Sequence, residues 1–85
     1  MELYEVNGKM KLLRYYGELS ARFDSRKSFY GKAKILTDSN NNYYLLSYST
    51  IVSISKNGKV EHFGKWSQTT TRHQKEFEKQ FTFNY

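Results

Sequence analysis

The segment that decides the fold spans residues 43–55 and reads YYLLSYSTIVSIS. Apolar side chains recur at every second position of it, at Leu46, Tyr48, Val52 and Ile54. Serines occupy the opposite parity, at Ser47, Ser49, Ser53 and Ser55. This period of two predicts a β-strand with one buried face and one solvated face. Because the segment is long for one strand, we predict a bend or bulge near Ser49 and Thr50.

Two Asn-Gly pairs predict tight hairpins in the surrounding chain. Asn57-Gly58 leads to a strand over residues 59–63, and Asn7-Gly8 joins strands over residues 2–6 and 9–16. Both residues of such a pair accept the positive φ that a two-residue turn requires. A further strand is predicted over residues 29–37. It is followed by a turn over residues 38–42, where Asp, Ser and Asn side chains bond their own backbone.

The end of the chain predicts a helix. Thr71-Arg72-His73-Gln74 fits a capping box, in which the Thr hydroxyl accepts from the backbone and Gln reaches back. The helix is expected over residues 72–81, with Phe77 and Phe81 on the face that packs against the sheet. The expected fold class is therefore α+β: an antiparallel β-meander of four to six strands with one C-terminal helix packed on one face. Residues 1–85 are expected to form a single small domain.

Composition restricts the classes of function. The 85 residues carry 14 basic and 8 acidic side chains, a net charge of +6, and no cysteine. The lack of cysteine excludes disulfides, thiolate zinc sites and cysteine nucleophiles. No signal peptide or membrane-spanning run is present, so we expect a cytoplasmic protein with no membrane partner, no cofactor and no small-molecule substrate. The charge favours an anionic partner, although it also lies within the range that keeps small domains soluble.

Cations and aromatic rings alternate in one region of the chain. The cations are Arg22, Arg26, Lys27, Lys32 and Lys34, and the rings among them are Phe23, Phe29 and Tyr30. Cations that bind phosphates beside rings that stack on bases are the components of a single-strand nucleic-acid surface. The alternative is structural: Phe29 and Tyr30 belong to the core, and the lysines form a solvated strand face. The pattern leaves both interpretations open.

The start of the predicted helix is a second candidate site. Its polar side chains are Thr69, Thr70, Thr71, Arg72 and His73. Free backbone N–H groups at a helix start attract anions, and hydroxyls and an Arg side chain add to that attraction. Capping, together with bonds that hold the turn at Trp66, would need only one threonine. The surplus favours Thr70, Arg72 and His73 as binding residues.

Metal and catalytic sites are less favoured. His62 and His73 are the only histidines, and two imidazoles are too few for a zinc site, so no metal is expected. With Arg72 and Lys75, the two histidines could supply the acid, base and phosphate clamps of a ribonuclease. Small ribonuclease toxins usually begin with helices, however, whereas this chain begins with a hairpin. No strained nucleophile elbow or glycine-rich phosphate loop is present.

Three segments together carry a family resemblance. They are SFYGKA at residues 28–33, SYSTIV at residues 47–52 and TTTRHQKEF at residues 69–77. Their order resembles a group of small uncharacterised proteins of bacteriophages and other mobile elements, a domain of unknown function. The resemblance covers roughly residues 26–81 and implies a phage or prophage origin and an intracellular life in a bacterial host.

Three functions remain open from the sequence. The first is a non-catalytic accessory protein that binds host or foreign nucleic acid through its basic face. The alternative is an inhibitor of a host defence system, similar to an anti-CRISPR protein, that binds a host protein or ribonucleoprotein. A ribonuclease toxin is the third.

Overall fold

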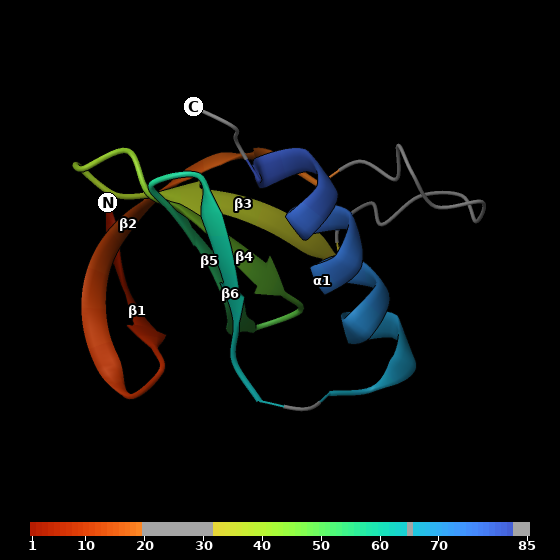
Figure 1. Ribbon diagram of the computed structural model, residues 1–85. Coiled ribbons are helices and arrows are strands. Elements are labelled where there is room, and N and C mark those ends of the chain that lie inside the picture. The colour runs from red at the N-terminus through yellow and green to blue at the C-terminus, as the bar shows by residue number, and fades with distance from the viewer. Residues whose placement is uncertain (20–31, 65, 83–85) are drawn as a thin grey trace.

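The chain folds into a curled sheet of six antiparallel strands with one helix packed against it (Figure 1). This computed structural model describes residues 1–19, 32–64 and 66–82. The strands are β1 (Glu2–Val6), β2 (Lys9–Glu18), β3 (Ala33–Thr37), β4 (Tyr43–Ser47), β5 (Thr50–Lys56) and β6 (Lys59–His62), and the helix is α1 (Gln68–Phe81). Neighbours in sequence are neighbours in the sheet, so the chain is a meander. The predicted α+β class and the C-terminal helix are confirmed.

The two Asn-Gly turns form as predicted. Asn7 and Gly8 have φ values of 49° and 88°, and Asn57 and Gly58 have values of 56° and 79°. They connect β1 to β2 and β5 to β6. Two consecutive positive φ values match the twist of the flanking strands, which explains why these pairs identify hairpins so well.

The turn after β3 also follows the prediction. The Asp38 carboxylate accepts from the backbone N–H groups of Asn40 and Asn42, at 2.8 and 3.0 Å. It also accepts from the Tyr44 hydroxyl at 2.7 Å. Burial alone would raise the pKa of Asp38, but these hydrogen bonds from Tyr44, Asn42 and Asn40 lower it overall.

The segment over residues 43–55 is interrupted near Ser49 and Thr50, as predicted, but the interruption is a hairpin turn that reverses the chain and not a bend within one strand. β4 ends at Ser47, Tyr48 and Ser49 form the turn, and Ser47 pairs with Thr50. A bulge follows, because Leu46 pairs with Ile51 and Leu45 pairs with Ser53, which leaves Val52 as the extra residue. The two-residue turn shifts the parity of the facing side chains by one, and the bulge shifts it back. The alternation therefore continues through both irregularities and conceals them in the sequence.

The serine face is buried, which corrects the expectation that it is solvated. Ser47, Ser53 and Ser55 are all buried. The Ser55 hydroxyl donates to the backbone carbonyl of Phe81 at 2.6 Å, so this face lies under α1. Tyr48, expected in the core, is instead exposed. Hydroxyls can line a buried face when each finds a partner, and alternation alone does not say which face is covered.

Both faces of the central strands carry a core. The cluster between sheet and helix is Leu19, Ala33, Ile35, Leu45, Val52 and Phe77. The cluster inside the curl is Val6, Leu13, Leu36, Tyr44, Leu46 and Ile51. Phe77 is fully buried and stacks on Phe81 with ring centroids 4.8 Å apart, which confirms the predicted helix face. Of the apolar positions that the strand pattern assigned to one buried face, Val52 shares the cluster of Phe77, while Leu46 lies in the other cluster.

Two element boundaries differ from the prediction. α1 begins at Gln68 with Ser67 as its N-cap, whose hydroxyl accepts from the Thr70 N–H at 3.4 Å. Thr71, predicted as the cap, lies inside the helix, because Ser67 is an equally suitable cap one turn earlier. β3 begins at Ala33, and residues 29–31 of the predicted strand lie outside the described residues. The described part of the chain holds no helix that has the length and apolar character of a membrane span.

Candidate functional site

The structure locates only part of the predicted basic cluster. Arg22, Arg26, Lys27 and Tyr30 lie outside the described residues. Lys32 is exposed immediately before β3. Lys34 is half-buried within β3, and its neighbours Ala33 and Ile35 face α1, so its side chain points to the opposite face of the sheet. Of the two described members, Lys32 is therefore the one that stays near the helix.

The start of α1 is bonded to the end of β4. The Ser47 Oγ lies 2.8 Å from Nδ1 of His73 and 3.1 Å from Oγ1 of Thr70. Burial lowers the pKa of His73, and the charges of Arg72 and Lys32 lower it further. Both cations therefore act on a buried imidazole, and the Thr70 and His73 side chains hold the helix to the sheet.

Tyr48 stands beside this polar cluster. Its side chain is 55% exposed, and its ring centroid lies 5.9 Å from that of His73. Its backbone N–H donates to the carbonyl of Lys32 at 2.8 Å. We call Lys32, Tyr48 and Arg72 the helix-start surface. The sequence indicated Lys32 and Arg72, but the strand parity wrongly assigned Tyr48 to the core.

The backbone of Tyr48 is strained. Its φ is 56°, whereas the other described non-glycine residues with positive φ are asparagines. Asparagine tolerates this region, but an aromatic residue there incurs a cost of roughly 1–3 kcal/mol. An exposed ring brings little burial in return. A two-residue turn requires positive φ at its first position, so the turn imposes this strain, and the exposed ring that stands there in place of Asn or Gly is a candidate for contact with a ligand.

Ser53, His62 and Glu78 form a chain of polar contacts across three elements. The Ser53 Oγ lies 2.7 Å from Nδ1 of His62, and Nε2 of His62 lies 2.7 Å from Oε1 of Glu78. Ser, His and an acid are the residue types of a hydrolase triad. Here Ser53 is 0% exposed, so its oxygen is out of reach of a substrate in this arrangement. The contacts instead tie β5 and β6 to α1.

The two histidines do not combine into a metal site. His62 bonds Ser53 on β5, whereas His73 bonds Ser47 at the end of β4. Within the described ranges, no three His, Cys, Asp or Glu side chains gather where they could hold a metal ion.

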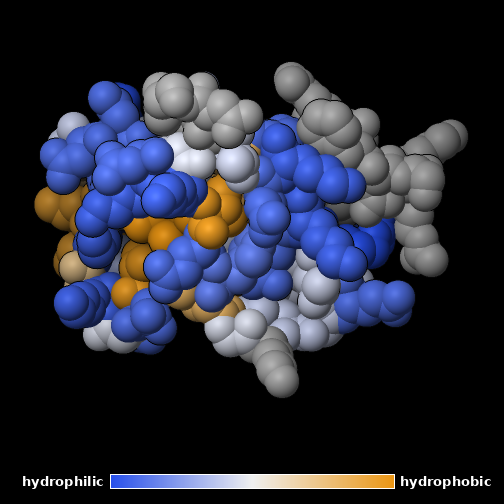
Figure 2. Space-filling view, in the orientation of Figure 1, coloured by the Kyte–Doolittle hydropathy of each residue, from blue (hydrophilic) through white to orange (hydrophobic). Residues whose placement is uncertain are grey.

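A groove that the sequence analysis missed runs between β1–β2 and β5–β6. The curl of the sheet brings these two hairpins to face each other and leaves about 680 Å³ between them. Four exposed lysines line it: Lys9, Lys11, Lys56 and Lys59. Its apolar lining comes from Val6, Ile54, Val60 and Phe63. We call it the lysine groove, and Figure 2 shows hydrophobic surface bordered by hydrophilic side chains over these elements.

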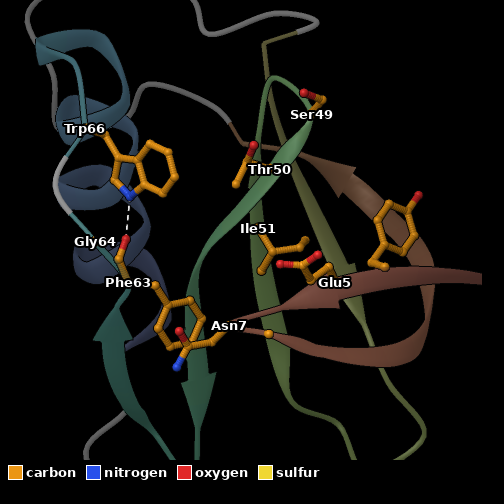
Figure 3. A pocket seen from close by; sticks show the side chains of 10 residues that line it. Glu5, Asn7, Ser49, Thr50, Ile51, Phe63, Gly64 and Trp66 are labelled. Atoms are coloured by element: carbon orange, nitrogen blue, oxygen red, sulfur yellow. Dashed lines mark hydrogen bonds between the residues drawn. The ribbon is translucent and has the colours of Figure 1, made fainter.

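A smaller pocket of about 390 Å³ adjoins the groove (Figure 3), since Asn7 and Phe63 line both. Trp66 lines this Trp66 pocket and is 42% exposed. Its indole N–H donates to the carbonyl of Phe63, and its ring rests against Gly64, where a Cβ would come within 3.3 Å. Gly64 also has a φ of 71°, so a side chain there is disfavoured both by the contact with the indole and by the backbone conformation. The ring is therefore exposed and yet fixed in orientation.

One signal of the groove was present in the sequence. A lysine follows each Asn-Gly turn, at Lys9 and Lys59. The sequence did not show that the two turns belong to one groove, because that depends on the curl of a sheet whose facing hairpins are separated by two strands.

The described parts of the three segments that carry the family resemblance meet in the structure. Ala33 pairs with Ser47 in the sheet, and Ser47 bonds His73. No curated protein and no solved structure gives a match to the chain. A family model does match, from Gly17 in β2 to the last residue, which leaves β1 and most of β2 outside. Because residues 17–85 are most of its length, the chain belongs to the family of unknown function DUF8033.

Proposed function

We propose that the protein binds nucleic acid, without catalysis, through the helix-start surface. The observation that carries this proposal is a grouping around His73: the exposed ring of Tyr48 lies beside it, Arg72 precedes it in α1, and the Lys32 carbonyl accepts from the Tyr48 backbone N–H. Cations attract phosphates, and an aromatic ring beside them provides a stacking platform for a base. Arg22, Arg26, Lys27 and Tyr30 are predicted to extend this surface, from a segment outside the described residues.

The chemistry of the described histidines supports binding rather than catalysis. A general base must reach the proton that it removes. His73 is 0% exposed, and the serine beside His62 is equally buried. Both imidazoles already bond serine hydroxyls that link the sheet to the helix or to a neighbouring strand. Their contacts are those of structural residues.

The proposed setting is a bacterial cytoplasm in which the protein serves a phage or another mobile element, as the resemblance of the three segments implies. The second candidate function is inhibition of a host defence system. The observation that favours it is the lysine groove, because a row of lysines between two sheet edges also suits an acidic protein segment. If the partner is an acidic protein, its capture by this protein from a host lysate should be the same with and without nuclease treatment.

The test measures fluorescence anisotropy of labelled single- and double-stranded DNA and RNA at several salt concentrations. If phosphate contacts dominate, binding weakens steeply with salt, with a slope of about −0.7 to −0.9 per phosphate neutralised. Lys32→Ala and Arg72→Ala should each flatten the slope by about one such unit and weaken binding to all sequences alike.

Arg14→Ala is the matched control. Arg14 is an exposed cation in β2 that pairs with Thr37, at the opposite end of β3 from Lys32. The Arg14→Ala substitution removes one positive charge, as Arg72→Ala does, but leaves the helix-start surface intact, so binding should change little. A folded protein that binds no nucleic acid at low salt would eliminate this function and favour the inhibitor. Equal losses for Arg14→Ala and Arg72→Ala would show that net charge, not this surface, drives binding.

A further inference from the structure

The Trp66 pocket and the lysine groove together form one continuous hollow, which we call the seam. From its geometry we infer that the seam holds a single-stranded nucleic acid, with a base in the Trp66 pocket and phosphates along the lysine groove. This inference rests on the proposed function and specifies its ligand.

The pocket has the properties of a base-binding site. Its volume of about 390 Å³ lies within the range of small-ligand pockets. Phe63 and Tyr4 also contribute rings to the lining of the pocket, and Figure 3 shows the indole projecting into the opening across from Thr50. The bond to the Phe63 carbonyl and the contact with Gly64 fix the indole in place. A ring oriented in advance loses little freedom when a base stacks on it.

The groove has the charge that a phosphate backbone requires. Lys56 and Lys59 are directly opposite each other across the β5–β6 turn. Like charges in such a pair repel, so their juxtaposition favours an anion between or beside them. Lys9 and Lys11 face them from β2, and the only acid among the groove-lining residues is Glu61.

The pocket suits the base of a nucleotide, and the lysine groove suits its phosphate. The acid of the pocket, Glu5, would repel a phosphate but can accept hydrogen bonds from the amino group of a base. The lysines lie in the groove instead. The pocket also adjoins the helix-start surface, because Ser49 follows Tyr48 directly and Trp66 precedes the N-cap Ser67. A strand can therefore pass from the lysines through the pocket to Tyr48.

A single strand fits this arrangement better than a duplex. A base can enter a pocket between rings only when its faces are not already stacked in a helix. An acidic peptide would satisfy the lysines but would leave the ring pocket without a matching group. The seam therefore selects unpaired bases, and Trp66 makes this selection measurable because it is the only tryptophan of the chain.

The experiment follows the intrinsic fluorescence of Trp66 in the full chain. Four probes are titrated: a single-stranded oligonucleotide, the matched duplex, inorganic polyphosphate and poly-glutamate. We expect the single strand to quench the fluorescence and to bind more tightly than the duplex. Polyphosphate should bind competitively without equal quenching, because it has phosphates but no bases.

Variants separate the two hollows. Trp66→Ala should weaken single-strand binding, measured by anisotropy, about 5- to 100-fold. Lys56→Ala and Lys59→Ala should each reduce the salt slope by about 0.7 and leave the quenching at saturation intact. Arg14→Ala, which removes an exposed cation that lines neither hollow, is the matched control and should leave binding nearly unchanged. The lysine variants, on an exposed turn, keep the test valid even if Trp66→Ala fails to fold.

The outcomes distinguish this inference from the proposed function. If no nucleic acid binds, both are wrong. If single strands bind without changing Trp66 fluorescence, and the variants in the seam bind normally, the seam is not the binding site. The proposed binding through the helix-start surface would then still stand. Equal affinity for duplex and single strand, or tighter binding and stronger quenching by poly-glutamate, would also overturn the inference, the latter in favour of a protein partner.

Discussion

Tyr48 combines an exposed ring with a left-handed backbone, and the two together allow a sharp test. Replacing it with Asn, which tolerates positive φ, should raise the free energy of unfolding by about 1 kcal/mol, the low end of the cost of such a conformation. For a domain of this size, that corresponds to a melting temperature about 4–8 °C higher. Thermal unfolding followed by circular dichroism measures the change.

The same variant should bind nucleic acid more weakly, because the stacking ring is gone. A gain in stability with a loss of binding is the result that a functional residue produces. If Tyr48→Asn instead destabilises the protein and binds normally, the contact between Tyr48 and His73 is structural, and the strain has no role in binding.

His73 should make stability depend on pH. Burial, with the charges of Arg72 and Lys32, holds its pKa below the ordinary value of 6.5. As pH falls below about 6.5, the unfolded chain takes up a proton there more readily than the folded chain does. The free energy of unfolding should therefore be highest above this value and should decrease between about pH 7 and pH 5, by up to about 1.4 kcal/mol per pH unit from this group.

Melting temperatures at pH 7.5, 6.5 and 5.5 measure the slope, and His73→Gln isolates its source. The variant should be less stable at pH 7.5, because it disturbs a buried contact with Ser47, but it should lose less stability on acidification. An identical slope in both proteins would assign the pH dependence to groups other than His73.

At the scale of elements, α1 depends on one buried ring. Phe77 is 0% exposed and belongs to the cluster between the sheet and the helix. Phe77→Ala should cost about 3–5 kcal/mol, a large share of the stability of a small domain. Urea unfolding measures this cost, and we expect a largely unfolded or aggregated variant at 37 °C. A loss below about 1 kcal/mol would mean that the serine contacts, and not this ring, hold the helix.

Most elements of the fold could be predicted because their signals are local. Asn7-Gly8 and Asn57-Gly58 specify their turns by φ alone, and Phe77 and Phe81 specify the helix face by their spacing. The turn at Tyr48 and Ser49 was predicted only as a bend or bulge, because it has no Gly or Asn to identify it as a chain reversal. The burial of Ser53 escaped detection because the partner of its hydroxyl, His62, lies on another strand.

At the scale of the whole molecule, the candidate site was only partly predictable. Lys32 and Arg72 were identified from local charge, and the contact of the sheet with α1 brings both close enough to His73 to affect its pKa. Predicting the seam would have required knowing that the first and last hairpins face each other. No local pattern in the sequence contains this information. Lys9 and Lys56 are far apart in the chain, and only the curl of the sheet places them in one groove.

The open curl also affects how copies of the chain meet one another. β1 and β6 are the two edges of the sheet, and an exposed edge is a template on which a strand from another molecule can add. Charged side chains, lysine above all, discourage such pairing. Lys59 and Glu61, which are exposed on β6, and Glu2 and Glu5, which are exposed on β1, therefore also discourage aggregation through these edges. Neutralising them exposes the edges, so colloidal stability and ligand affinity depend on the same few charges.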